Sequence, residues 1–247
     1  MNLVVDIGNT RVKAATYENG VVVDQLAVDY EGLIQLTRWI ESQAPYSGAI
    51  VSTVKEETDT ATRLILAAIP VEPIILSHTT PIPIKNCYTT PETLGNDRLA
   101  AAVAAHNLFP NNNVLVIDIG TAITFDLTTS LGEFLGGNIS PGIVLRLKAL
   151  HSFTSKLPLV EANFRAPRIG KNTEEAIQSG VYQGIISEID GFIKIISSEV
   201  DSLMVILTGG DANYFVENLK NPIFVNLNIV IDGLNMILEY NKNARND

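Results

Sequence analysis

Cysteine is almost absent from this chain of 247 residues, in which Cys87 is the only one. A single cysteine excludes an internal disulfide, a zinc site built from several cysteines and an iron–sulfur cluster. The three histidines are scattered and lack the spacing of a zinc site. The sequence therefore predicts neither a disulfide-stabilised scaffold nor a zinc enzyme, and it fits a reducing compartment.

Long hydrophobic runs are also missing. No stretch approaches the ~18 consecutive apolar residues of a membrane span. The N-terminus, MNLVVDIGNT, has no basic region, and Asp6 interrupts its apolar run early. We therefore expect a soluble, cytoplasmic protein that is not exported and has no membrane partner.

Positive charge is scarce, because 17 Lys and Arg oppose 27 Asp and Glu, for a formal net charge of -10. An acidic chain repels phosphate backbones, so we expect no nucleic-acid partner. A local basic pocket for a small anion stays compatible with this charge. Hydrophobic residues make up 46% of the chain, which is ample for a packed core and argues against disorder.

Three familiar nucleotide-binding signatures are absent from the sequence. There is no GxxxxGK[ST] loop, no GxGxxG after a predicted strand and no protein-kinase motif set. A Walker-type NTPase, a dinucleotide-binding enzyme and a protein kinase are therefore not supported.

A repeated pattern of strands is present instead. Residues 2–7, 11–17 and 20–28 are predicted strands, and residues 114–119, 123–128 and 133–139 repeat their order. The runs LVVDIGNT and VLVIDIGT both place an aspartate and a glycine turn after the first strand. Although a chance repeat is an alternative, the pattern favours two similar α/β subdomains that pack closely around a cleft.

The remaining segments read mainly as helices. Helical patterns are predicted at 58–69, 94–108, 142–150, 173–197, 212–219 and 233–240. We place the N-terminal subdomain at 1–93 and the C-terminal subdomain, with the substrate and dimerisation helices, at 94–247.

The first hairpin carries groups that suit phosphate and a metal ion. Gly8 lets the backbone approach a phosphate, and the amides of Asn9 and Thr10 can donate to its oxygens. Asp6 can hold Mg²⁺, directly or through water, and Lys13 supplies a compact positive charge. The alternative is an ordinary hairpin in which Asp6 caps a turn.

The second hairpin repeats this chemistry with Asp118, Gly120 and Thr121. Two facing hairpins of this kind could clamp a triphosphate and its metal from both sides. A third motif, Thr208-Gly209-Gly210-Asp211, follows a buried strand, and its glycines permit flat contact with a base or ribose. Taken alone, the third motif is better explained as a tight strand-to-helix turn.

The fourth motif, Gly95-Asn96-Asp97-Arg98, opens the predicted helix 94–108. Asp97 could accept a proton from a substrate hydroxyl while Arg98 neutralises phosphoryl charge. Phosphoryl transfer depends mainly on positioning and electrostatics, so a weak base is sufficient. The alternative is that Asp97 caps the helix and Arg98 is a solvated charge.

Taken together, these motifs resemble the acetate and sugar kinase, Hsp70 and actin superfamily, and most closely type III pantothenate kinase. The family patterns DxGNTxxK, GxDR, DxGTAxT and GGxIxPG appear as DIGNTRVK, GNDR, DIGTAIT and GGNISPG. Leu157-Pro158, the helix start Gly170–Thr173 and the TGG turn complete the set. The resemblance covers nearly the whole chain and implies two duplicated ribonuclease H-like (actin-like ATPase) subdomains, each a mixed sheet flanked by helices.

The resemblance also implies an activity, which is ATP-dependent phosphorylation of the primary hydroxyl of pantothenate, the first step of coenzyme A synthesis. It implies Asp97 as the general base, Asp118 as the ligand of a monovalent cation (K⁺ or NH₄⁺) and Mg²⁺ alongside ATP. The residues implied to bind pantothenate are Tyr88, Gly95, Asn96, Asp97, Arg98 and Thr173. Those implied to bind ATP are Asp6, Ile7, Gly8, Asn9, Thr10, Arg11, Val12, Lys13 and Thr121.

Family members are homodimers with the pantothenate site across the interface, so the resemblance also implies a homodimer. The small-residue helix Ala100–Ala105 is consistent with close packing at that interface, or else with packing inside the monomer. Competing interpretations are another kinase or phosphatase of the superfamily, a nucleotide-binding accessory regulator of transcription, and an actin-like filament protein. The GNDR motif and the short length of the chain weigh against another kinase or phosphatase of the superfamily. Asp97 argues against a pure binder, which needs no base.

Overall fold

The computed structural model describes residues 1–54 and 59–244. The chain divides into two compact units, of which unit 1 comprises 1–110, 131–135 and 228–247, and unit 2 comprises 111–130 and 136–227. This division differs from the expected one after residue 93. Helix α3 (Asn96–Leu108) and the C-terminal helix α6 (Ile229–Ala244) pack on the N-terminal sheet, so both belong to unit 1.

Unit 1 is built on a five-stranded mixed sheet in the order β3-β2-β1-β4-β5. Strands β1 and β2 are antiparallel and form the first expected hairpin, whereas β1 and β4 are parallel. The strands are β1 (Asn2–Ile7), β2 (Arg11–Glu18), β3 (Val21–Asp29), β4 (Gly48–Thr53) and β5 (Ile74–Ile75).

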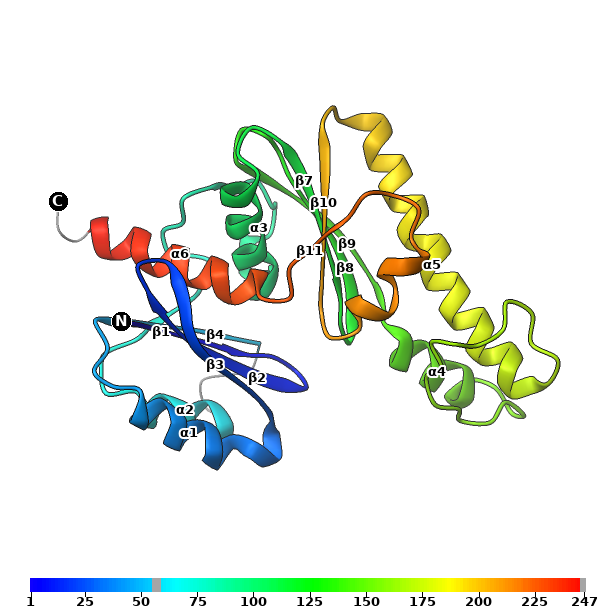
Figure 1. Cartoon of the computed structure of the whole chain (residues 1–247), viewed down its shortest axis with the longest axis horizontal. Coiled ribbons are helices and arrows are strands. Elements are labelled where there is room, and N and C mark those ends of the chain that lie inside the picture. The colour runs from blue at the N-terminus through cyan, green and yellow to red at the C-terminus, as the bar shows by residue number, and fades with distance from the viewer. Residues whose placement is uncertain (55–58, 245–247) are drawn as a thin grey trace. The chain divides into compact units, whose positions relative to one another are not determined.

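Helices cover both faces of this sheet, as Figure 1 shows for α1 and α2 on one side and α6 on the other. Because side chains alternate between faces along a strand, Leu3 and Val5 pack against α1 and α2, while Val4 packs against α3 and α6. Burial on both faces explains the unbroken apolar run of β1. The helices are α1 (Leu33–Ser42), α2 (Thr60–Ala68), α3 (Asn96–Leu108) and α6 (Ile229–Ala244).

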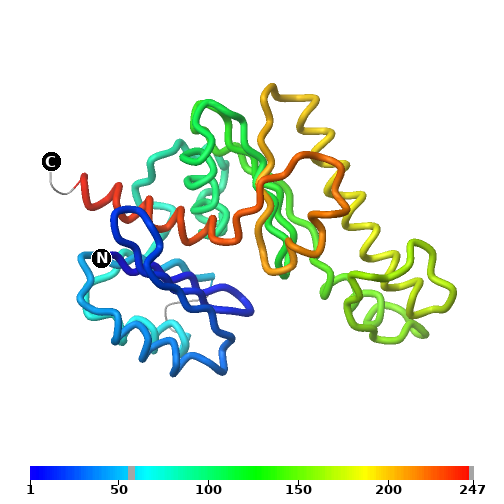
Figure 2. Tube along the Cα trace, in the orientation of Figure 1, coloured from blue at the N-terminus to red at the C-terminus, as the bar shows by residue number. Residues whose placement is uncertain are grey.

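Helix α3 is buried within unit 1 along its small-residue stretch, Ala100–Ala105, for which both an interface and packing inside the monomer were left open. A Cβ atom on Gly233 of α6 would lie 1.9 Å from the carbonyl oxygen of Ala100, which shows how closely the two backbones approach. The alternative of packing inside the monomer is confirmed, because small residues let α3 and α6 touch. Figure 2 shows α6 (red) returning to the N-terminal strands (blue).

Unit 2 contains the second expected hairpin. Strand β10 pairs in parallel with β7, which pairs antiparallel with β8, within a sheet ordered β11-β10-β7-β8-β9-β6. The short strand β6 joins this sheet through the first residues of β9, which belong to unit 1. The strands are β6 (Lys85–Asn86), β7 (Asn113–Ile119), β8 (Ala122–Thr128), β9 (Glu133–Pro141), β10 (Leu203–Thr208) and β11 (Phe224–Val225).

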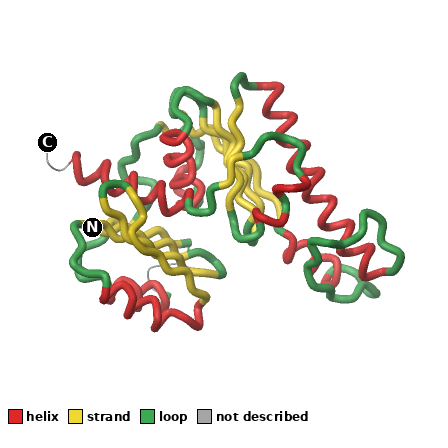
Figure 3. Tube along the Cα trace, viewed as in Figure 1, coloured by secondary structure: helices red, strands yellow, loops and turns green. Residues whose placement is uncertain are grey.

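The core of unit 2 lies between its sheet and the long helix α5 (Thr173–Glu199). Leu115, Ile117 and Ile119 alternate along β7 and pack against isoleucines on one face of α5. Helix α4 (Ile143–Ser152) packs beside α5 through Leu147. Figure 3 shows in red and yellow how helices alternate with strands in each unit.

The expected helix at 212–219 is wrong, because the structure has two single 3-10 turns, η3 (Ala212–Tyr214) and η4 (Val216–Asn218). The carbonyl of Tyr214 accepts from the Tyr182 hydroxyl at 2.6 Å, so an α5 side chain holds the segment in place of a longer helix. The expected helix at 58–69 begins at Thr60, and its first residue lies outside the described residues. The last helix is longer than expected, at Ile229–Ala244.

Within the described ranges, no helix has both the length and the hydropathy that crossing a membrane requires.

Candidate functional site

The first hairpin places Asp6 at the end of β1, between two polar neighbours. In the sheet register Asp6 lies opposite Lys13 on β2 and opposite Ser52 on β4. The hairpin folds the DIGNTRVK motif back on itself, so its first residue, Asp6, and its last residue, Lys13, lie side by side. Ser52 was not identified from the sequence, where a serine inside a predicted strand gives no signal.

The carboxylate of Asp6 is electrostatically unfavourable in the protein alone. Its Oδ1 is enclosed and has no hydrogen-bond partner. Burial raises the pKa of Asp6 from 3.8 to about 6, and the negative charge of Asp97 adds to the increase, while Ser52 and Lys13 lower it. The site therefore favours a bound cation or hydrogen-bond donor beside Asp6.

The loop after β1 is closed by a backbone hydrogen bond and has exposed residues at its tip. The Gly8 amide donates to the Arg11 carbonyl at 3.1 Å, which closes the turn, and Asn9 and Thr10 are exposed. The hydroxyl of Tyr30 donates to the Gly8 carbonyl at 2.5 Å. The backbone amides of an exposed loop whose conformation is held by hydrogen bonds are suited to binding an anion.

The GNDR motif forms the start of helix α3, in the same unit as Asp6. A Cβ atom at Gly95 would lie only 2.5 Å from Asp97 Oδ1, so glycine leaves space for that carboxylate. The backbone amide of Arg98 donates to Asp97 Oδ1 at 2.8 Å. The Arg98 side chain is buried, and its guanidinium lies 5.6 Å from the centroid of the Tyr88 ring, a cation–π contact.

A cavity of about 380 Å³ borders this motif in unit 1. It is lined by Gly95 and Asn96 from the motif, by Thr53 at the end of β4, and by Ser77 and His78, among others. The Asn96 side chain donates to the Leu76 carbonyl at 2.9 Å, which fixes the motif to the connection after β5. A small polar substrate can reach Gly95 and Asn96 through this cavity.

Unit 2 repeats the arrangement of Asp6 around Asp118. At the end of β7, Asp118 lies opposite Thr124 on β8 and opposite Thr208 on β10. The Gly120 amide donates to the Ala122 carbonyl at 3.0 Å, and Thr121 is exposed beside it. The cation partner of the first hairpin, Lys13, is replaced here by a threonine, so only neutral groups neighbour Asp118 in the register.

Glycines bring two further motifs against this loop. Gly209 has a φ of +97°, and a Cβ there would lie 2.4 Å from the Ile119 carbonyl oxygen. A Cβ on Gly142 would lie 2.2 Å from the Gly120 carbonyl oxygen. Close backbone contact therefore requires glycine at Gly209 of the TGG motif and at Gly142 of the GGNISPG motif.

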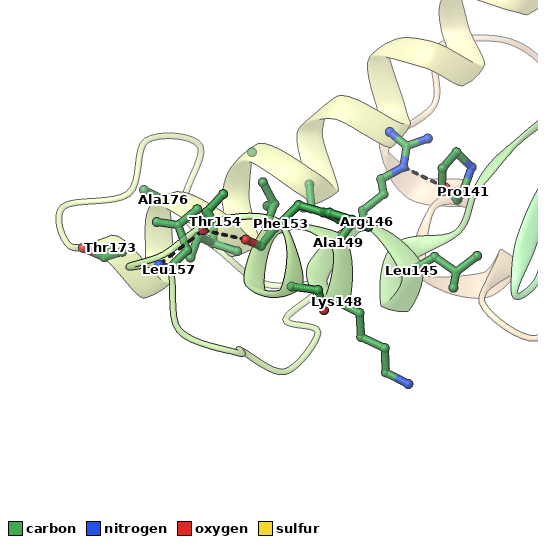
Figure 4. A pocket seen from close by; sticks show the side chains of 15 residues that line it. Pro141, Leu145, Arg146, Lys148, Ala149, Phe153, Thr154, Leu157, Thr173 and Ala176 are labelled. Carbon is green, nitrogen blue, oxygen red and sulfur yellow. Dashed lines mark hydrogen bonds between the residues drawn. The ribbon is translucent and has the colours of Figure 1, made fainter.

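An apolar groove of about 1180 Å³ runs between α4 and the start of α5 in unit 2. Figure 4 shows Thr173 at one end of the groove and Pro141 and Leu145 at the other. Arg146 donates from Nε to the Pro141 carbonyl at 2.7 Å and pairs with Glu188 of α5. Phe153 lines the groove and is 88% exposed, which is unusual for so large an apolar side chain.

The predicted site residues thus fall into two groups. Unit 1 contains the Asp6–Lys13 loop and the Gly95–Arg98 motif, with the Arg98 guanidinium over the ring of Tyr88. Unit 2 contains Asp118, Thr121 and Thr173. Thr173 lies in the groove between α4 and α5, whereas Asp118 lies at the end of β7.

The donor groups of the protein limit how a metal ion could be held. No cluster of three or more acidic, histidine or cysteine side chains that could hold a metal occurs in the part of the chain that the structure describes. Mg²⁺ commonly takes one or two carboxylates and completes its shell with phosphate and water. The unpartnered Oδ1 of Asp6 fits this limited role beside a nucleotide.

Solved structures establish the fold. A protein from Campylobacter jejuni described as a conserved Baf family transcriptional activator aligns with a TM-score of 0.63 at 20% identity, over 98% of this chain and 99% of its own. The activator of 2-hydroxyisocaproyl-CoA dehydratase from Clostridium difficile, with bound ADPNP, aligns with a TM-score of 0.57 at 12% identity. The alignment covers 99% of this chain and 97% of the activator. The ROK hexokinase from Thermus thermophilus aligns with a TM-score of 0.52 at 13% identity, over 97% of this chain and 99% of the hexokinase. The expected actin-like fold is confirmed.

Sequence relatives carry more information than the fold. A Bacteroides fragilis protein named type III pantothenate kinase is 46% identical over 98% of both chains. A relative of the same name from Porphyromonas gingivalis is 41% identical over 97% of this chain and 98% of its own. Another, from Christiangramia forsetii, is 39% identical over 98% of this chain and 99% of its own. The profile described as type III pantothenate kinase matches residues 2–195. These names do not favour a transcriptional regulator, and this chain belongs to the type III pantothenate kinase family.

Proposed function

We propose residue roles for the reaction of this pantothenate kinase, which phosphorylates pantothenate with ATP in coenzyme A biosynthesis. In this assignment Asp97 is the general base and the Asp6–Lys13 loop binds the phosphates of ATP. The observation that carries the assignment is the GNDR motif at the start of α3, where Gly95 leaves space for the Asp97 carboxylate and borders a cavity. The motif lies in the same unit as the Asp6–Lys13 loop, so unit 1 contains both a proton acceptor and a candidate phosphate loop.

Asp97 would orient the primary hydroxyl of pantothenate and accept its proton as the oxygen attacks the γ-phosphorus. Its Oδ1 is already occupied by the Arg98 amide, so Oδ2 is the oxygen proposed to receive the proton. Holding the hydroxyl in line with the phosphoryl group supplies most of the rate enhancement. The side chain of Arg98, fixed over Tyr88, supplies positive charge toward the transferring group.

The phosphates of ATP are assigned to Gly8–Thr10, Lys13 and, from the second hairpin, Thr121. Their amides, ammonium and hydroxyl offset the charge that spreads over the phosphoryl oxygens in the transition state. Asp6 is assigned as the protein's contact to Mg²⁺, directly or through water, and Asp118 as the contact to K⁺ or NH₄⁺. These cations supply electrostatic stabilisation of the same charge.

We also propose that the protein is a homodimer and acts in the cytoplasm. The groove between α4 and α5 supports the dimer, because Phe153 and Leu145 expose apolar surface that a second copy could bury. Thr173 lies in this groove, and the family resemblance assigns it to pantothenate binding across a dimer interface.

The test is ADP release by the purified protein with ATP, Mg²⁺ and pantothenate, in potassium buffer and then in sodium buffer. The expected result is turnover that depends on pantothenate and is stimulated by potassium. Equal turnover in both buffers would remove the assignment of Asp118 to a monovalent cation. Turnover with a sugar or acetate but not with pantothenate would contradict the proposed substrate.

A further inference from the structure

In each of the two candidate phosphate loops, after β1 and after β7, one backbone carbonyl accepts a hydrogen bond from a residue that directly follows the third strand of the hairpin region. In unit 2 the amide of Gly142, just after β9, donates to the Thr121 carbonyl at 3.0 Å. In unit 1 the hydroxyl of Tyr30, just after β3, donates to the Gly8 carbonyl at 2.5 Å. The two units thus meet the same need with a backbone group in one case and a side chain in the other.

The position of Tyr30 is determined by its surroundings. In the register of β2 and β3, Asp29 lies opposite Arg11, the first residue after the candidate phosphate loop. Tyr30, the next residue after Asp29, is therefore placed beside that loop. The Asp29 side chain accepts from the amides of Glu31 and Gly32 at 3.1 Å each, which turns the chain there. The Tyr30 ring is partly buried against the core to which α1 contributes, and its hydroxyl reaches the Gly8 carbonyl.

The bond to Gly8 has a direct consequence for the neighbouring amide. The Gly8 carbonyl and the Asn9 N–H belong to one planar, trans peptide group and point in opposite directions. When Tyr30 holds the carbonyl, the Asn9 N–H points away from the Tyr30 hydroxyl, and Asn9 itself is an exposed residue. Preorganised donors are effective because they need no reorientation when an anion binds.

We infer that Tyr30 is a positioning residue for ATP, which aims the Asn9 amide at the phosphates without touching them. The inference rests on the proposed role of the Asp6–Lys13 loop. Tyr30→Phe removes the hydroxyl and keeps the ring in the core. Loss of one positioning hydrogen bond is expected to raise the KM for ATP about fivefold, on the order of 1 kcal/mol, and to leave the KM for pantothenate unchanged.

Tyr46→Phe is the matched control. The Tyr46 hydroxyl also donates to a backbone carbonyl in unit 1, that of Ile40, at 2.5 Å, and the ring packs in the same core. Both variants lose one hydrogen bond of the same kind, so similar decreases in Tm are expected. Only Tyr30→Phe should change the KM for ATP, and it should weaken binding of a non-hydrolysable ATP analogue by the same factor.

Three outcomes would overturn the inference. The first is a KM for ATP that stays at the wild-type value in Tyr30→Phe. The second is an equal increase in Tyr46→Phe, which would reduce the effect to general destabilisation. The third comes from Lys13→Ala: if this variant also keeps the wild-type KM for ATP, the loop does not bind phosphate and the proposed function of the loop fails. An increase with Lys13→Ala but not with Tyr30→Phe refutes only the role of Tyr30.

Discussion

Replacing Asp6 with asparagine should make the protein more stable and nearly inactive. The pKa of Asp6 is raised from 3.8 to about 6, chiefly by burial and then by repulsion from Asp97. Each pKa unit corresponds to about 1.4 kcal/mol, so an ionised Asp6 costs the folded protein about 3 kcal/mol. The enclosed, unpartnered Oδ1 is the structural source of this cost.

The sign of the pH dependence follows from proton binding. Between pH about 4 and about 6 the folded protein binds more protons at Asp6 than the unfolded chain does. The contribution of Asp6 to the free energy of unfolding therefore falls as pH rises through this window, and it is fully lost above pH about 6. A neutral asparagine side chain at this position carries no such penalty, so the variant should gain nothing at pH 4 and about 1–3 kcal/mol at pH 7.5.

The assay is urea unfolding at pH 4, 5, 6 and 7.5, without nucleotide or Mg²⁺, next to kinase turnover at pH 7.5. Turnover should fall at least about 100-fold, because a ligand of the phosphate-bound metal is lost. The exposed Asp201→Asn is the control and should change neither quantity. A wild-type stability that does not decrease between pH 4 and 6 relative to Asp6→Asn would refute the reasoning. Such functional residues commonly cost stability.

Two further predictions concern the base and the subunit interface. Asp97→Asn should remove most turnover while ATP binding, measured by calorimetry, stays largely intact; wild-type turnover in this variant would show that Asp97 is not the base. Phe153→Glu should shift a dimer toward monomer in size-exclusion chromatography with light scattering, with little change in Tm because the side chain is 88% exposed. An unchanged dimer would move the interface away from the groove.

Much of the fold follows from local patterns. The apolar run of β1 and the alternation in β2 and β8 are properties of the residues themselves, so the strands of both hairpins were predicted within two residues of their observed ends. The segment 212–219 was predicted as a helix because its apolar spacing is helical. The Tyr182 hydroxyl and the preceding TGG turn hold it as two 3-10 turns, and such a distant contact leaves no local pattern.

The candidate site divides in the same way. The glycines and aspartates of the four motifs could be identified from the sequence because each serves a local need, such as the space that Gly95 leaves for Asp97. Ser52 and Tyr30 could not be identified, because their roles depend on strand register and on a contact between segments distant in sequence. The sequence left two alternatives open at Ala100–Ala105 for a related reason: small residues permit close packing but do not specify the partner.

By itself, the sequence determined the duplicated hairpins, the family and the residue types available for phosphoryl transfer. These depend on composition and short-range spacing, which can be determined from the linear sequence without knowing how the chain folds. Only the tertiary structure decided that α3 and α6 join the N-terminal sheet, that Asp97 raises the pKa of Asp6, and that Tyr30 holds the Gly8 carbonyl. Burial and electrostatic repulsion act through space, so they arise only when distant segments of the chain are packed together.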